Sequence, residues 1–226
     1  DNNSLKKPKI PQDPKVTYIQ NKSNIGFPAA VNQGLKLFVG DYVLILNPDT
    51  EIPKDFFSKA IGCLESDPKI GVVGPKFVDP NGHAQGSVYR ESSIIRTIQE
   101  FWFGKKGLTE KYTPETNIPV EVDVVMGACM FMSRKIVEKV GLFTDKVFYF
   151  YEDFDYCRRI RNLGYKVVFD PNITIKHAHG QSTKQDPQAN KLLMTASKWY
   201  NGNLKHSIIW FIMWTSQKAT KIFGRS

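Results

Sequence analysis

The stretch Tyr42-Val43-Leu44-Ile45-Leu46-Asn47-Pro48-Asp49-Thr50 carries the strongest fold signal in the sequence. Five consecutive apolar residues followed by a polar turn predict a buried β-strand over 42–46. A helix is predicted over 53–66, and Pro53 suits its first turn, where a missing N–H costs nothing. This part of the chain therefore forms a βα unit, with the polar residues 47–50 at the carboxyl end of its strand.

Segments on both sides continue the alternation of strands and helices. We predict strands over 16–19, 71–77, 120–125, 128–132, 166–169 and 173–176, and helices over 27–39, 92–103, 133–140 and 153–163. A turn is predicted over 79–82. This order indicates an α/β domain with a largely parallel sheet, in which ligands bind at the carboxyl ends of the strands.

Composition excludes several classes of protein. Of 226 residues, 41% are hydrophobic and 23% are charged, which is too apolar for a disordered chain and suits one domain with a short appendage. The three cysteines lie far apart and form no CxxC pair, which argues against a zinc ribbon and a disulfide framework. Together with the lack of a recognisable signal peptide, they favour the cytoplasm.

The net charge of +9 is concentrated at the end of the chain, where no Asp or Glu follows Asp186. We expect residues 186–226 to form a basic, amphipathic helical tail. Its apolar run 208–214 is far shorter than the roughly 20 residues of a membrane span, so we expect docking on an anionic membrane surface. The alternative is packing on the domain or on a second subunit. Nucleic acid is not expected, because the basic residues do not surround an aromatic platform.

Asp49 is a candidate metal ligand because it follows a buried strand. Mg²⁺ and Mn²⁺ prefer carboxylate oxygens and bridge phosphates. The alternative is that Asn47 and Asp49 only shape the turn.

Glu152, Asp153 and Asp155 stand at the start of a predicted helix, after an aromatic run over 147–151. A carboxylate in a half-buried cleft there could act as a general base. The alternative is that these acids only complement the charge of the helix N-terminus. His177 and His179 face the same side of an extended segment, either as metal or phosphate contacts or as structural residues.

These signals occur in an informative order. The segments that carry it are 24–34 (NIGFPAAVNQG), 46–50 (LNPDT), 123–130 (DVVMGACM), 151–159 (YEDFDYCRR) and 177–182 (HAHGQS). In this order they resemble family 2 glycosyltransferases, most closely the bacterial rhamnosyltransferase-like branch. The resemblance implies a GT-A fold over residues 1–185, with a mixed, mostly parallel sheet flanked by helices. It also implies that the family's first strand–helix portion is absent here, because residues 1–4 resemble the turn that follows it.

The resemblance implies a role for each candidate residue. Asp49 and His177 would hold Mg²⁺ or Mn²⁺, and Asp153 would be the general base, with Glu152 in support. The nucleotide-sugar donor would be bound by Asp1, Asn24, Asn32, Asn47 and Asp49. The acceptor would be bound by Gly127, Ala128 and Asp155.

The implied activity is inverting transfer of a hexose from a nucleotide sugar to a glycan or a lipid-linked acceptor, in bacterial surface polysaccharide synthesis. The donor implied first is dTDP-L-rhamnose, and the site of action is the cytoplasm or the inner face of the cell membrane. One alternative is a galactosyl, glucosyl or other hexosyltransferase. Another is a non-catalytic fragment that binds a glycan or a partner subunit. An oligomer stays open.

Overall fold

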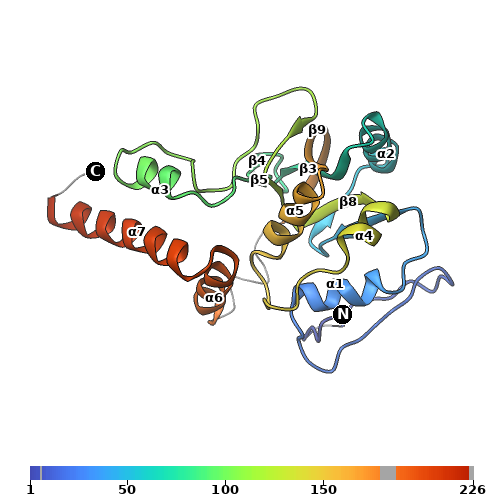
Figure 1. Cartoon of the computed structure of the whole chain (residues 1–226). Helices are drawn as coiled ribbons and strands as arrows, with labels where there is room; N and C mark the ends of the chain where they lie inside the picture. The colour runs from blue at the N-terminus through green and yellow to red at the C-terminus, as the bar shows by residue number, and fades with distance from the viewer. Residues whose placement is uncertain (6, 179–186, 224–226) are drawn as a thin grey trace.

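The computed structural model describes residues 1–5, 7–178 and 187–223 (Figure 1). Its helices are α1 (Phe27–Leu35), α2 (Phe56–Ser66), α3 (Ile94–Phe101), α4 (Arg134–Val140), α5 (Glu152–Asn162), α6 (Ala189–Asn201) and α7 (Asn203–Phe223). Its strands are β1 (Tyr42–Leu46), β2 (Thr50–Glu51), β3 (Ile70–Val78), β4 (Ala84–Gln85), β5 (Val88–Tyr89), β6 (Val120–Glu121), β7 (Val124–Val125), β8 (Cys129–Ser133) and β9 (Lys166–His177). The α/β class predicted from the sequence is confirmed.

The central sheet has the order β1-β8-β3-β9-β2, with β4 on β3 and β6 on β9. Among the described strands, β3 and β9 form the one parallel pair, and the other pairs are antiparallel. The mixed sheet is therefore confirmed: β1, β3 and β9 run in the same direction, although most directly paired strands are antiparallel. The physical reason is that β8 lies between β1 and β3 and runs opposite to both. The two parallel strands of the β1–α2–β3 unit therefore never touch.

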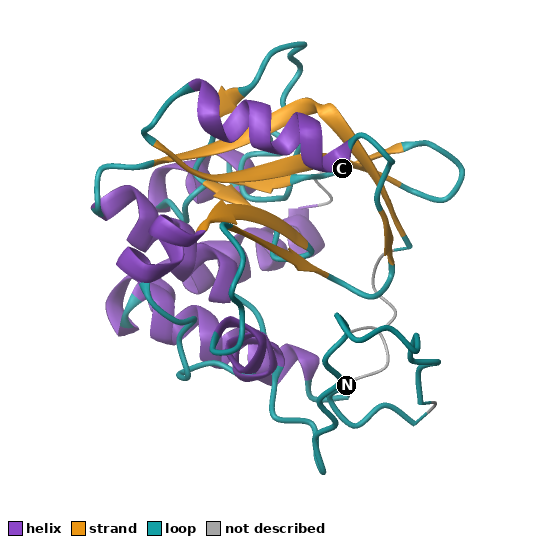
Figure 2. Ribbon diagram, turned by 90° about the vertical axis from the view of Figure 1, so that its right-hand side faces the viewer, coloured by secondary structure: helices purple, strands orange, loops and turns teal. Residues whose placement is uncertain are grey.

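Side chains alternate between two apolar layers on the two faces of the sheet. On β3, Val72 packs in the layer with α4 and α5, whereas Val73 packs in the layer with α2. The other long strands alternate in the same way, as the two-residue period of a strand requires. Figure 2 shows helices around the sheet. On β1, Val43 and Ile45 are buried, whereas Leu46 at its end is exposed.

Several predicted strands differ from the structure. Residues 120–125, predicted as one strand, form β6 and β7, which belong to two different sheets. Residues 16–19 form a loop, because no described strand pairs with them and the side chains of Val16 and Tyr18 are exposed. The two strands predicted over 166–169 and 173–176 form the single strand β9. Residues 171–173 form a bulge there, between the pairs Pro75–Asp170 and Lys76–Thr174, so the strand continues along β3 without a turn.

The C-terminal segment is helical and stands apart from the sheet. Helices α6 and α7 follow the α/β body, and α7 packs against α3 and α6 (Figure 1). In the part of the chain that the structure describes, no helix has the length and apolarity needed to cross a membrane.

Candidate active site

The first group of candidate residues lies where β2 pairs with the end of β9. Thr50 is opposite His177, and the Ala178 N–H donates to the Asp49 carbonyl at 2.9 Å. This pairing brings His177 Nε2 to 3.5 Å from Asp49 Oδ1. Two residues that are distant in the sequence are thus placed together, as a shared metal ion would need. His179 and the rest of the segment 179–182 lie outside the described residues.

The surroundings of His177 favour its neutral form. The side chain is only 4% exposed, and its ring centroid lies 5.2 Å from that of Phe77. Burial lowers the pKa of His177, although the nearby Asp49 carboxylate opposes this effect. A metal ion needs an unprotonated imidazole, so the lowered pKa suits a ligand.

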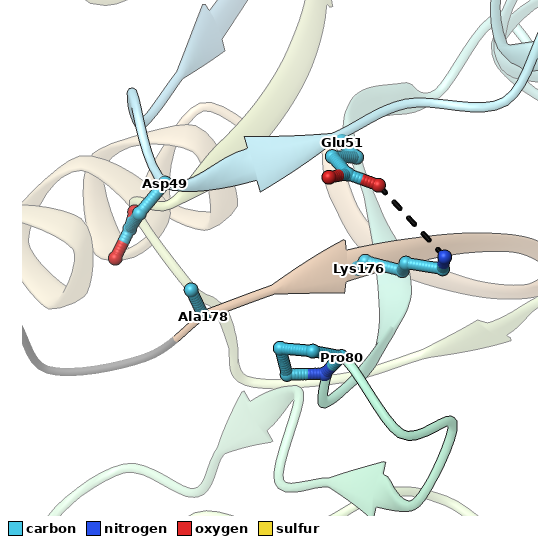
Figure 3. A pocket seen from close by; sticks show the side chains of 5 residues that line it. All are labelled: Asp49, Glu51, Pro80, Lys176 and Ala178. Atoms are coloured by element: carbon cyan, nitrogen blue, oxygen red, sulfur yellow. Dashed lines mark ion pairs between the residues drawn. The ribbon is translucent and has the colours of Figure 1, made fainter.

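A shallow pocket opens beside this pair, lined by Asp49, Glu51, Pro80, Lys176 and Ala178 (Figure 3). Across it, Glu51 Oε2 and Lys176 Nζ are 3.8 Å apart. Its volume of about 90 Å³ is well below the roughly 300–1,000 Å³ of a complete small-molecule site. The pocket therefore suits a fragment, such as a phosphate group or a cation.

The donor set here fits a divalent cation that is shared with a phosphate. The described residues hold no cluster of three or more His, Cys, Asp or Glu side chains that could enclose a metal. One carboxylate and one imidazole leave most coordination positions to phosphate oxygens and water. Mg²⁺ and Mn²⁺ are commonly bound in this way beside nucleotide phosphates.

The second group is formed by Glu152 and Asp153 at the start of α5. Asp153 Oδ2 accepts a hydrogen bond from the Gly127 N–H at 3.1 Å, and Oδ1 accepts one from the Phe154 N–H at 2.9 Å. Glu152 is only 9% exposed, and its Oε2 has no hydrogen-bond partner among the described residues. Asp153 therefore has a backbone donor on each oxygen, whereas one oxygen of Glu152 has none.

This difference decides which carboxyl of the pair retains its proton to higher pH. Burial raises the pKa of both carboxyls, and the charge of Asp153 raises that of Glu152 further. The two N–H bonds favour the ionised form of Asp153. The pair titrates as a unit, with Asp153 losing its proton first and Glu152 retaining its own to higher pH. An ionised Asp153 with a pKa raised toward neutrality is suited to accept a proton.

The backbone that leads into α5 is strained. Phe150 and Tyr151 have φ values of 74° and 65°, in the left-handed region that favours glycine. Such residues cost about 1–3 kcal/mol each and persist where surrounding contacts fix them. Here the Phe27 N–H donates to the Phe148 carbonyl at 2.8 Å. Gly26, with φ 86°, allows this approach, because a Cβ there would stand 2.5 Å from the Phe148 oxygen.

A short turn connects the two groups. The Asn47 N–H donates to the Ala128 carbonyl at 2.9 Å, and the adjacent Gly127 binds Asp153. Asn47, Gly127 and Ala128, all predicted site residues, are therefore brought between the Asp49–His177 pair and the Glu152–Asp153 pair.

The remaining predicted residues make contacts within the protein. The Asn32 side chain is engaged at both ends by the backbone of Phe143, and Asn24 Oδ1 accepts from Asn2 Nδ2 and the Gly26 N–H. Asp1 accepts from the Ser4 N–H, and Asp155 pairs with Arg159 at 2.9 Å. Their proposed roles toward donor and acceptor stay predictions.

Sequence reasoning missed Tyr200 of α6, which supports the second group. Its ring lies 5.1 Å from Tyr151 and 5.6 Å from Phe154, the residues on either side of the carboxylate pair. Its hydroxyl donates to Glu91 Oε1 at 2.7 Å, and the Arg158 guanidinium lies 3.6 Å above its ring. No local pattern marks Tyr200, because all of these partners are distant in the sequence.

Comparisons with known proteins identify the family of the chain. The model of the family described as Glycosyl transferase family 2 matches residues 3–141, more than half of the chain. The N-acetylglucosaminyl-diphospho-decaprenol L-rhamnosyltransferase of Mycobacterium tuberculosis is 26% identical over 195 residues, covering 78% of this chain and 63% of that protein. The dTDP-rhamnosyl transferase RfbF of Shigella flexneri is 26% identical over 181 residues, covering 78% of this chain and 57% of that protein.

Both relatives are therefore longer than this chain, which spans less than two thirds of either one. A solved structure with a similar fold is that of GalNAc-T7 with UDP, GalNAc and Mn²⁺. Its TM-score is 0.51 at 16% identity, covering 70% of this chain and 31% of that one. The match over residues 3–141 and the shared architecture lead to one conclusion: the chain belongs to glycosyl transferase family 2 and has the GT-A fold.

Proposed function

We propose that this chain carries the catalytic site of an inverting, metal-dependent rhamnosyltransferase. The donor is dTDP-L-rhamnose, and the acceptor is a sugar on a lipid carrier or a growing surface glycan. The names of the two relatives, one acting on a decaprenol-linked sugar and one using dTDP-rhamnose, support this choice of substrates. A lipid-linked acceptor would place the reaction on the cytoplasmic face of a membrane.

On the donor side, Asp49 and neutral His177 would hold Mg²⁺ or Mn²⁺. When bound, the ion neutralises charge that develops on the diphosphate leaving group. Asn47, whose backbone is fixed by Ala128, presents its side chain at the same turn, where it would bind donor ribose or phosphate.

On the acceptor side, Asp153 takes the proton from the attacking hydroxyl. The acceptor oxygen forms a bond to the anomeric carbon while the bond from that carbon to the phosphate oxygen breaks on the opposite face. The nucleoside diphosphate leaves with the bonding electrons, and the anomeric centre is inverted in one step. Glu152, protonated at neutral pH, adds no second negative charge and can donate a hydrogen bond to the acceptor.

The observation that carries the proposal is the environment of Asp153. It is a half-buried carboxylate with a raised pKa, oriented by the Gly127 N–H and joined through Gly127 and Ala128 to the turn that bears Asp49. Reacting groups held in this way need little reorganisation in the transition state.

A donor screen tests the proposal. The chain is incubated with Mn²⁺ and with dTDP-rhamnose, UDP-galactose, UDP-glucose or GDP-mannose, and release of the nucleoside diphosphate is measured. We expect the fastest release from dTDP-rhamnose. Faster release from another donor would favour a different hexosyltransferase.

Calorimetry with dTDP and UDP provides the second arm. Binding that requires Mn²⁺ supports an enzyme, whereas no nucleotide binding with or without metal would favour a non-catalytic fragment that binds a glycan or a partner subunit. Asp67→Asn, which alters a surface ion pair with Lys166, is the control for general effects of removing a carboxylate.

A further inference from the structure

Helix α7 has one apolar face that the protein does not cover. Leu204, Phe211 and Trp214 are 77%, 63% and 55% exposed. They are spaced seven and three residues apart, which places their side chains on one side of a helix. The opposite side carries the buried residues His206, Ile212 and Ser216, and Ser216 Oγ donates to the Phe101 carbonyl at the end of α3. One face of α7 is thus occupied by the protein, and the other, which we call the outer face of α7, is open.

The outer face is ordered and basic at its end. The rings of Phe211 and Trp214 are stacked with centroids 6.3 Å apart, and Lys218 Nζ lies 5.9 Å from the centroid of the Trp214 ring. On the adjoining helix α6, Lys191 and Lys198 are exposed. No acidic residue follows Asp186 in the sequence. A partner for this face must therefore be apolar beneath an anionic layer.

The tryptophans of the chain are concentrated in the same part of the molecule. All four tryptophans of the chain, Trp102, Trp199, Trp210 and Trp214, lie within α6 and α7 or directly after α3. Tryptophan is enriched where an apolar phase meets water, because its ring is apolar and its N–H needs a polar partner. These helices stand away from the α/β body, so a flat surface can approach them (Figure 1).

We propose that the outer face of α7 lies on the surface of an anionic lipid bilayer, with Leu204, Phe211 and Trp214 at the level of the headgroups and Lys218 on the lipid phosphates. The helix lies in the plane of the surface, since no described helix is suited to span it. The benefit of this docking to catalysis rests on the proposed function, in which the acceptor is lipid-linked. Tyr200 on α6 contacts both neighbours of the carboxylate pair, so a docked arm would hold the acceptor side near the lipid.

The test is co-sedimentation of the full chain with vesicles of phosphatidylglycerol and phosphatidylcholine. We expect binding that weakens with salt and is lost on vesicles of phosphatidylcholine alone. The double variant Phe211→Ser, Trp214→Ser should bind about 100-fold more weakly, because each large apolar side chain contributes substantially to burial in lipid. Lys218→Gln should weaken binding about fivefold, the effect of one cation near an anionic surface.

Two matched controls keep the test specific. Ile95→Ser removes an apolar side chain that is 68% exposed on α3, on the side opposite the buried Thr97, and should leave vesicle binding unchanged. Lys22→Gln removes an exposed cation far from α7 in the sequence and should also have no effect. Circular dichroism verifies that each variant is folded.

Three results would overturn the proposal. They are equal binding to neutral vesicles, equal binding by the double variant, and a concentration-dependent dimer in size-exclusion chromatography that the double variant abolishes while vesicles are not bound. The last result would assign the face to a second copy of this chain. Donor hydrolysis measured without vesicles stays unchanged in the double variant, so failure here and failure of the proposed activity are distinguishable.

Discussion

The two acidic centres of this chain hold the same chemical group in different surroundings. Asp49 is partly open to solvent, with its side chain 23% exposed, and faces an imidazole. Glu152 is buried and Asp153 is half-buried, and Asp153 faces backbone N–H groups. Exposure beside a neutral histidine keeps a carboxylate available as a cation ligand, whereas burial beside a second carboxylate raises the pKa and prepares it for proton transfer. The surroundings of each carboxylate, and not its residue type, distinguish the two proposed roles.

The largest expected effect comes from the buried centre. Asp153→Asn retains the size of the side chain but cannot accept a proton at neutral pH. Turnover in a transfer assay should fall by about 10²–10⁴-fold, the usual contribution of a general base, while nucleotide binding is little changed. Turnover close to wild type in this variant would move the role of base to Glu152 or Asp155 and break the comparison.

Substitution of Asp49, in the open centre, should change nucleotide binding. Asp49→Ala removes one of the two protein ligands proposed for the cation, so Mn²⁺-dependent binding of dTDP should become undetectable by calorimetry while circular dichroism is unchanged. Glu51→Ala is the matched control, because Glu51 lines the same pocket but pairs with Lys176. If both variants bind alike with the same metal dependence, the metal does not depend on Asp49.

The pH dependence of stability distinguishes the Glu152–Asp153 centre from the Asp49 centre without an assay of activity. The folded pKa values of Glu152 and Asp153 are raised above their unfolded values, so the folded state binds more protons than the unfolded state. The free energy of unfolding should therefore fall as pH rises above about 4, by about 1.4 kcal/mol for each unit of pKa shift. Glu152→Gln should flatten this fall in urea denaturation, whereas the control Glu138→Gln, on the exposed side of α4, should leave it as in wild type.

The smallest effect is expected from Tyr200→Phe. The variant loses the hydrogen bond to Glu91, which retains Arg158 and Arg161 as partners. We expect a loss of about 1 kcal/mol and a fall in Tm of about 2–4 °C by calorimetry. Because Tyr200 supports only the buried centre, turnover should fall while Mn²⁺-dependent nucleotide binding is retained. A parallel loss of both would show that the two centres are not independent.

Local sequence patterns predicted the elements that carry the site. The apolar run over 42–46 is β1, and the helix predicted over 153–163 is α5 shifted by one residue. Both signals are strong because the residues that define them are adjacent in the chain. The meeting of Asp49 with His177 needed the family resemblance, since their spacing in sequence contains no information about the β2–β9 pairing.

Other features could not be predicted from the sequence, because they depend on partners far along the chain. The run over 16–19 has strand composition, but composition cannot supply a neighbouring strand. The hydrogen bonds of the Asn32 side chain to the Phe143 backbone are likewise not visible in the sequence, and the assignment of Asn32 to the donor stays a prediction. Tyr200 and the open face of α7 became visible only when α3 and α6 were placed beside them.

The position of β8 between β1 and β3 also has a consequence for the order of folding. Tyr42 pairs with Ser133, so β1 cannot complete its pairing until most of the chain has been synthesised. Until then β1 and β3 expose unpaired edges, a condition that favours slow folding and transient association. Because Gly127 and Ala128 directly precede β8, the link between the two acidic centres closes in the same event. An unfinished chain therefore cannot hold Asp153 against Gly127, and the proposed base would be positioned only when the sheet closes.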